Sequence, residues 1–95
     1  MIELISDPKV ILMEKRIGSI LILITDRSAV KVLNGLISNY ADIIIGRQGL
    51  PVHSTRNGII SLVLEGTTDQ ISALSGQLGR LSGISVKSVV LKQIV

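Results

Sequence analysis

Few residues in this chain have the types and spacings that enzyme or metal chemistry needs. Its 95 residues include one histidine, His53, and no cysteine, which excludes thiolate nucleophiles, thiolate metal sites and disulfides. The seven carboxylates show no D-x-D or H-E-x-x-H spacing, and Asp26 and Asp69 stand where predicted helices begin, as caps. General acid–base catalysis needs a nucleophile or a second acid within reach of the first. We therefore predict a protein that is not an enzyme, with no catalytic residues, metal site or cofactor.

The richest cationic cluster lies in the middle of the chain and consists of Arg47, His53 and Arg56. A guanidinium offers paired donors, so the cluster predicts a clamp for a carboxylate or a phosphate. The alternatives are a solvated loop and, for His53, a metal or anion bridged between subunits. The net charge is +3, but the basic residues form no run of four and Tyr40 is the one aromatic residue. Binding of nucleic-acid bases needs aromatics beside the cations, so we expect no direct nucleic-acid binding.

Apolar spacing predicts the elements that position these residues. We expect strands at 16–25, 42–51, 58–66 and 84–92, a helix that Asp26 caps, and a second helix over 71–83 that residues 67–69 cap. The segment HSTRNG (53–58) predicts a hairpin turn. In the first helix, the residues expected to face the sheet are Ala29, Val32, Leu33, Leu36, Ile37 and Tyr40. The order β-α-β-β-α-β predicts an α+β, ferredoxin-like sandwich, in which a four-stranded antiparallel sheet carries both helices on one face.

A single domain over residues 14–95 accounts for the whole pattern. Residues 1–13 lie outside it as an N-terminal extension, which is either an additional edge strand or a stretch upstream of a natural start at Met13. The longest apolar run, Ile20–Ile24, is too short to span a bilayer, so we expect no membrane interaction. The lack of cysteine and of a signal-peptide cleavage pattern indicates a prokaryotic cytoplasm.

Both faces of the predicted sheet are apolar. In the first strand Ile20, Ile22 and Ile24 alternate with Ile17, Leu21 and Leu23, and in the third Ile60, Leu62 and Leu64 alternate with Ile59 and Val63. Two helices cover one face only, and a face left in water normally carries polar residues. We therefore expect a homo-oligomer, a dimer or a tetramer, in which a partner subunit covers the second face. An internal cover from residues 1–13 is the alternative.

The second helix carries glycines on the side away from its apolar stripe. Ile71, Leu74, Leu78 and Leu81 form the apolar stripe, and Ser72, Gly76, Gly79 and Gly83 form a second stripe about 150° around the helix. An interior glycine costs about 1 kcal/mol relative to alanine. Because a bare stripe allows another backbone or a ligand to approach closely, we interpret Ser72, Gly76 and Gly79 as a contact surface. A merely tolerated bare surface is the alternative.

The most distinctive stretches are IIIGRQGLP (43–51) and ALSGQLGRLSGISVKSV (73–89). With the rest of residues 13 to 92, they resemble a family of small prokaryotic proteins named as candidate regulators of the iron-only hydrogenase system. That family is ferredoxin-like and related to ACT domains and to the C-terminal domain of the nickel-responsive regulator, which bind small effectors at oligomer interfaces. The resemblance implies an effector site at the turn formed by Thr25, Asp26, Arg27, Ser28 and Ala29.

Two departures limit what the resemblance implies. ACT domains that bind amino acids usually have Pro-Gly after a strand-ending Asp-Arg, whereas here Ser28 and Ala29 follow, and the Ala29 methyl group is a small obstacle to a ligand. The nickel-responsive domain uses several histidines and a cysteine around its hairpin. The corresponding segment RQGLPVHSTRNG offers one histidine and no cysteine, which excludes a square-planar nickel site within one chain.

These observations predict a non-enzymatic, homo-oligomeric, ACT-like regulatory domain that senses a small effector or docks on a protein partner. The resemblance adds hydrogenase or redox regulation as its setting. Two alternatives stay open, a ligand-free structural oligomerisation module and an amino-acid-sensing regulatory subunit. The candidate effector-binding or interface residues are Thr25, Asp26, Arg27, Ser28, Ala29, Arg47, His53, Arg56, Ser72, Gly76 and Gly79.

Overall fold

Strands and helices follow one another in the predicted order. The computed structural model of the chain describes residues 14–52 and 57–94. The elements are β1 (Lys15–Ile24), α3 (Val30–Ser38), β2 (Ile44–Val52), β3 (Asn57–Thr67), α4 (Thr68–Gly79) and β4 (Ile84–Ile94). Short 3-10 turns at Arg27–Ala29 and Ala41–Ile43 precede α3 and β2. None of the helices in the described ranges is long and apolar enough to cross a membrane.

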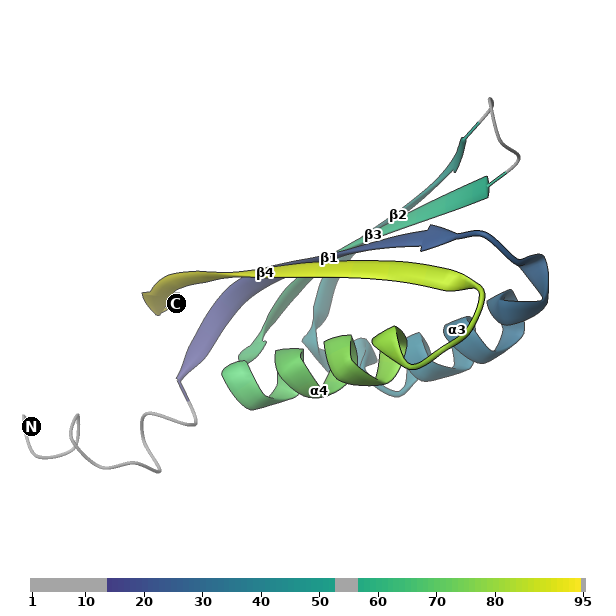
Figure 1. Cartoon of the computed structure of the whole chain (residues 1–95). Helices are drawn as coiled ribbons and strands as arrows, with labels where there is room; N and C mark the ends of the chain where they lie inside the picture. Colours follow the sequence, from purple (N-terminus) through teal and green to yellow (C-terminus); the bar gives the residue numbers. More distant parts are fainter. Residues whose placement is uncertain (1–13, 53–56, 95) are drawn as a thin grey trace, which may run out of the picture.

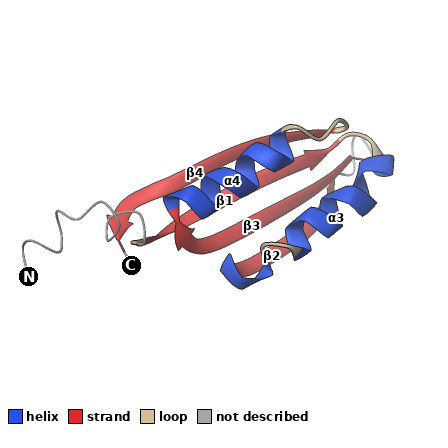
Figure 2. Ribbon diagram, turned by 90° about the horizontal axis from the view of Figure 1, so that it is seen from below, coloured by secondary structure: helices blue, strands red, loops and turns tan. Residues whose placement is uncertain are grey.

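The four strands form one antiparallel sheet in the order β2-β3-β1-β4. Both helices lie across the same face of that sheet, α4 over β1 and β4 and α3 toward β2 (Figure 1, Figure 2). The prediction of a ferredoxin-like α+β sandwich is therefore confirmed. β1 is an inner strand, paired with β3 on one side and β4 on the other, and the turn after Ile24 leads from it into α3.

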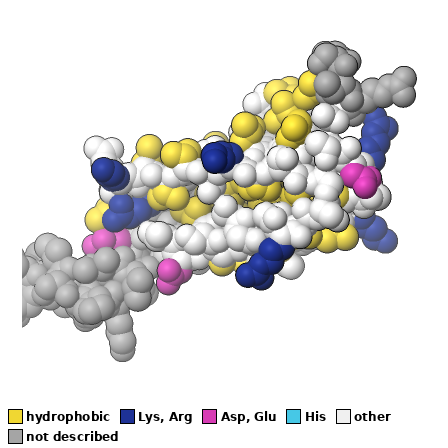
Figure 3. Space-filling view, viewed as in Figure 1, with side chains coloured by type: hydrophobic (Ala, Val, Ile, Leu, Met, Phe, Trp, Pro, Cys, Tyr) yellow, Lys and Arg dark blue, Asp and Glu magenta, His cyan; other side chains and the backbone are white. Residues whose placement is uncertain are grey.

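Alternation along the strands separates a covered face from an open face. The covered face and the helix stripes above it form the core, which contains Ile20, Ile22, Ile24, Leu33, Ile37, Ile60, Leu62, Leu64, Ile71, Leu74 and Leu78. The register places Ile17, Ser19, Leu21 and Leu23 of β1 on the open face, beside Ile59, Ser61, Val63 and Glu65 of β3. On that face the side chains of Leu21 and Val89 stay 53% and 61% exposed. Hydrophobic side chains are visible along the side of the molecule away from the helices (Figure 3).

Gly18 lets α4 pack tightly against β1. A Cβ atom at this position would lie 3.1 Å from the carbonyl oxygen of Val89 and 3.2 Å from Cδ1 of Ile71. Ile71 belongs to the buried stripe of α4, together with Leu74 and Leu78. The close approach of helix and sheet therefore depends on a glycine in the strand, while the glycines of α4 itself face outward.

Some details of the sequence prediction are wrong. Asp69, expected to cap the second helix, lies in the first turn of α4, and Thr67 is the residue that caps it. Val32, expected to face the sheet, is 59% exposed, because it lies about 100° around the helix from the buried Leu33, beyond reach of the strands. Gly83, assigned to the outer stripe of the second helix, lies outside that helix, which ends at Gly79 with Arg80 as its C-cap. Gly83 has a φ of 83°, and a Cβ atom there would lie 2.7 Å from Cβ of Asp26. It therefore closes a tight contact between two turns.

Candidate functional site

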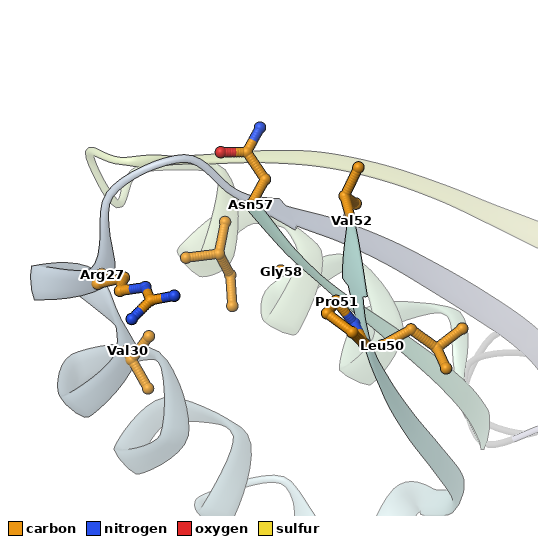
Figure 4. Close-up of a pocket in the computed structure, with 8 residues that line it drawn as sticks. Arg27, Val30, Leu50, Pro51, Val52, Asn57 and Gly58 are labelled. Atoms are coloured by element: carbon orange, nitrogen blue, oxygen red, sulfur yellow. The ribbon is translucent and has the colours of Figure 1, made fainter. Parts of the chain in front are cut away.

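A cleft of about 640 Å³ lies at the end of the sheet where the β1–α3 turn faces the ends of β2 and β3 (Figure 4). Its lining residues are Ile24, Arg27, Val30, Leu50, Pro51, Val52, Asn57 and Gly58. The sequence predicts the turn and the hairpin segment as separate candidate sites. The structure brings one residue of the turn, Arg27, into the same cleft as the residues that flank the hairpin.

Strand register explains why these segments meet. Gly58 of β3 is paired with Ile24 of β1 on one side and with Pro51 of β2 on the other, so the three strands reach this end of the sheet together. Gly58 contributes no side chain, and a Cβ atom there would make ordinary contact with Ile24, 3.7 Å from its Cδ1. No side chain projects from the β3 backbone at Gly58, and the neighbouring Ile24 gives the wall of the cleft an aliphatic surface at this point. The cleft is open to solvent.

Arg27 is the one charged side chain among the described residues that line the cleft. Its guanidinium points from the turn toward the strand end that carries Leu50 and Pro51 (Figure 4). A guanidinium presents paired N–H donors that match a carboxylate or a phosphate. The cleft thus combines one anion-binding group with an aliphatic surface, an arrangement that fits a small anion with an apolar body.

The other residues of the predicted turn serve the turn itself. The backbone N–H groups of Thr25 and Asp26 and the Thr25 hydroxyl donate hydrogen bonds to the carbonyl oxygen of Gly83, at 2.8, 3.0 and 3.1 Å. Asp26 Oδ1 accepts from the backbone N–H and the hydroxyl of Ser28, at 2.9 and 2.8 Å. Ala29 is buried. These contacts fix the direction in which the chain leaves β1, and so they position Arg27.

The carboxylate of Asp26 is exposed but is stabilised by its turn. The hydrogen bond from the Ser28 backbone N–H, and then the one from the Ser28 hydroxyl, hold the pKa of Asp26 below its ordinary value. Both bonds favour the charged form of the acid. Asp26 therefore acts as the cap that the sequence predicted, although the first turn it caps is a 3-10 turn.

Arg47 lies away from this cleft, on the covered side of β2 beside α3. Its register partner on β3 is the buried Leu62, and its Nη2 donates a hydrogen bond to Oδ1 of Asn34 at 2.7 Å. It borders a separate hollow of about 250 Å³ together with Ile37, Ser38, Ala41 and Ile44. His53 and Arg56 lie outside the described residues. The predicted cluster of Arg47 with His53 and Arg56 therefore stays a prediction.

Ser72, Gly76 and Gly79 lie on the exposed side of α4, as the helical spacing predicts. A Cβ atom at either glycine would have nothing within 4 Å in one chain, apart from the helix's own neighbouring backbone. Their proposed role as a contact surface stays a prediction. Among the described residues no three histidine, cysteine, aspartate or glutamate side chains gather closely enough to hold a metal ion.

Sequence reasoning missed Ile24, Val30, Leu50, Pro51, Val52 and Gly58 as residues of a site. Each has a local explanation, as the end of a strand, the first turn of a helix or a hairpin flank. Nothing local signals that they share a cleft, because their meeting depends on strand register.

Comparison with known families gives a match over residues 16–88 to the TM1266-like family, described as "Iron-only hydrogenase system regulator, putative". That match covers most of the sheet and both helices. The chain belongs to this family. A search of curated proteins gave no match.

One solved structure agrees with this family membership, and others share the fold. The uncharacterized protein TM1266 from Thermotoga maritima is 41% identical, with a TM-score of 0.78 over 83% of this chain and 100% of its own. The C-terminal domain of the MgtC protein from Mycobacterium tuberculosis is 13% identical, with a TM-score of 0.64 over 81% of this chain and 88% of its own. Part of a homoserine dehydrogenase from Thiobacillus denitrificans is 10% identical, with a TM-score of 0.58 over 86% of this chain and 19% of its own. The last two show a shared fold only.

Proposed function

We propose that this TM1266-like chain is a non-enzymatic, homo-oligomeric, ACT-like regulatory domain that senses a small effector in the Arg27 cleft. The family description supports a regulatory role and connects it with the iron-only hydrogenase system. The cytoplasmic location expected from the sequence is part of the proposal. Control of a target would pass through a protein partner.

One observation carries the choice of an effector sensor: Arg27 and the ends of β1, β2 and β3 line the same cleft. Val30 at the start of α3 lines it as well, so an occupant would touch both the sheet and the helix layer. Ligands commonly bind in mostly apolar clefts in which a few polar groups fix their orientation. Binding there can favour one placement of α3 relative to the strand ends, provided that the ligand has unequal affinity for the two placements.

The chemistry of the lining favours a small aliphatic carboxylate. The guanidinium of Arg27 would receive the carboxylate, and Leu50, Pro51 and Val52 would cover the alkyl part. A zwitterionic amino acid also needs a partner for its ammonium group. The described lining residues include no acidic side chain, so we expect simple carboxylates to bind better than amino acids.

Titration of the full chain with pentanoate, hexanoate and octanoate, with leucine in parallel, tests the proposal by calorimetry and thermal shift. We expect saturable binding of the carboxylates. Arg27→Gln should weaken it about tenfold, because a hydrogen bond to a charged group contributes about 1.5 kcal/mol or more. Arg80→Gln is the matched control, since Arg80 is an exposed arginine at the C-cap of α4, outside the cleft.

The alternatives correspond to different results. Tighter binding of leucine than of the carboxylates, still dependent on Arg27, would identify an amino-acid-sensing subunit. No binding of any probe, together with a stable oligomer, would support a ligand-free oligomerisation module and contradict the effector proposal. Equal losses in Arg27→Gln and Arg80→Gln would show that the anion binds by general charge attraction and not in the cleft.

A further inference from the structure

The open face has a shallow hollow at its centre, directly over β1. The hollow measures about 160 Å³ and is lined by Ile17, Gly18, Ser19, Val63, Val89 and Leu91. The hydroxyl of Ser19 donates a hydrogen bond to the carbonyl oxygen of Leu62 at 3.0 Å, so it is satisfied within the sheet. The hollow is therefore apolar, and a water molecule in it would find few hydrogen-bond partners. An apolar side chain from outside would fill it favourably.

Two opposite charges flank this hollow on the same face. Glu65 of β3 is paired with Ile17, on one side of β1, and Lys87 of β4 is paired with Leu21, on the other side. Ser19 lies midway between Ile17 and Leu21 along β1. The acidic and basic positions are thus arranged on opposite sides of Ser19. Lys15, at the outer end of β1, is the other charged residue that the register assigns to this face of β1 and β3.

We propose that the open face binds a second copy of this chain, through a two-fold axis that runs in the interface plane over Ser19. Such an axis exchanges the positions of Glu65 and Lys87, so each Glu65 meets the Lys87 of the other copy and the pair forms twice. The exposed Leu21, Val63 and Val89 around the axis then cover the two central hollows. An isologous contact of this kind satisfies the same patch on both copies.

The register also determines how the two sheets cross. Glu65 and Lys87 lie two strand spacings apart, about 10 Å, and four residues apart along the strands, about 13 Å. An axis that exchanges their positions must be perpendicular to the line that joins them. The strands of the two copies would therefore cross at about 70°, closer to the orthogonal class of sheet packing than to the aligned class. Only the central part of the face, about 20 by 20 Å, overlaps in such a crossing. We expect a small interface that dissociates on dilution.

A charge-reversal series on the full chain tests the pairing. Glu65→Lys and Lys87→Glu should each weaken dimerisation at least tenfold in sedimentation equilibrium, and the double variant should recover most of the loss. Lys31→Glu, on the exposed surface of α3, is the matched control and should leave dimerisation unchanged. Circular dichroism of each variant confirms folding. Single variants that dimerise normally, a double variant that does not recover, or a wild-type chain that is monomeric at 100 µM would each overturn the proposal.

Cysteine cross-linking tests the position of the axis, because the chain has no cysteine of its own. Ser19→Cys lies on the axis and should form covalent dimers with the shortest bifunctional thiol reagents. Ser85→Cys is the control: Ser85 is paired with Leu23 on the same face, but its two copies would be more than about 20 Å apart. A Ser19→Cys chain that resists thiol reagents as a monomer would show that residues 1–13 cover the face, which also overturns the proposal.

This inference rests on the homo-oligomeric part of the proposed function. Its failure can be distinguished by experiment from a failure of the effector proposal. Carboxylate binding in the Arg27 cleft, measured on the Lys87→Glu variant, reports on the effector site alone. Retained binding with an unaltered dimer would reject this interface and leave the sensor proposal intact. Lost dimerisation with normal binding supports the interface and the separate cleft together.

Discussion

The two faces of the sheet have the same kind of side chains and opposite environments. On the covered face Ile20, Ile22, Leu62 and Leu64 are fully buried by α3 and α4. On the open face the neighbouring Leu21 and Val63 remain 53% and 40% exposed. The covered face has no charge among its buried residues, whereas the open face carries Glu65 and Lys87 on either side of an apolar centre. Within the described residues, α3 and α4 cover one face of the sheet and leave the apolar side chains of the other face exposed, which is the observation behind the proposal that a second copy binds there.

Adjacent residues of β3 provide the sharpest contrast between the two faces. Leu62→Ala should destabilise the fold by about 2–5 kcal/mol, because it leaves a cavity in the buried core. Val63→Ala should change the stability of dilute protein by less than about 0.5 kcal/mol, as surface substitutions usually do. At high concentration it should weaken dimerisation. Urea denaturation at two protein concentrations measures both effects. Equal losses at both positions and both concentrations would contradict the contrast.

The turn that closes the covered face can be tested at Gly83. Gly83→Ala places an L residue at a φ of 83° and a methyl group 2.7 Å from Cβ of Asp26. The left-handed backbone alone costs about 1–2 kcal/mol, and the contact adds to that. The control Gly35→Ala adds a methyl that would have nothing within 4 Å, beyond the backbone of α3 itself, and should be neutral or slightly stabilising. A Gly83→Ala protein that melts as the wild type does would show that the two turns separate easily.

The outer side of α4 is a third surface, and the effect expected there is the smallest. Gly76→Ala and Gly79→Ala place methyl groups in open space in a single chain, so each should raise stability by up to about 1 kcal/mol. Dimerisation through the open face should not change. The contact-surface hypothesis predicts the reverse, since an added methyl would collide with an opposing backbone or ligand and typically cost 1–3 kcal/mol. Melting temperature and sedimentation mass, measured together, decide the sign.

Local patterns in the sequence predicted a large part of this fold. Strict alternation predicted that Ile20, Ile22 and Ile24 share one face of the sheet, because successive strand residues point to opposite sides. The structure shows that this is the face that the helices cover. Thr67 was predicted within the cap of the second helix, and it forms a capping box with Gln70 through bonds of 2.9 and 3.2 Å. These signals are local, because a helix cap involves residues three apart and the apolar stripe of a helix repeats every three or four residues.

Only the tertiary structure decided which of these residues meet. The Arg27 cleft forms because Ile24, Gly58 and Pro51 lie in one row across three strands. The hydrogen bond from Arg47 to Asn34 joins β2 to α3, and no local pattern in the sequence predicts it. The arrangement of Glu65 and Lys87 around Ser19 likewise depends on two separate registers. Alternation fixes the face on which a strand residue lies, whereas its neighbours on that face are set by pairing between distant segments, which no local pattern encodes.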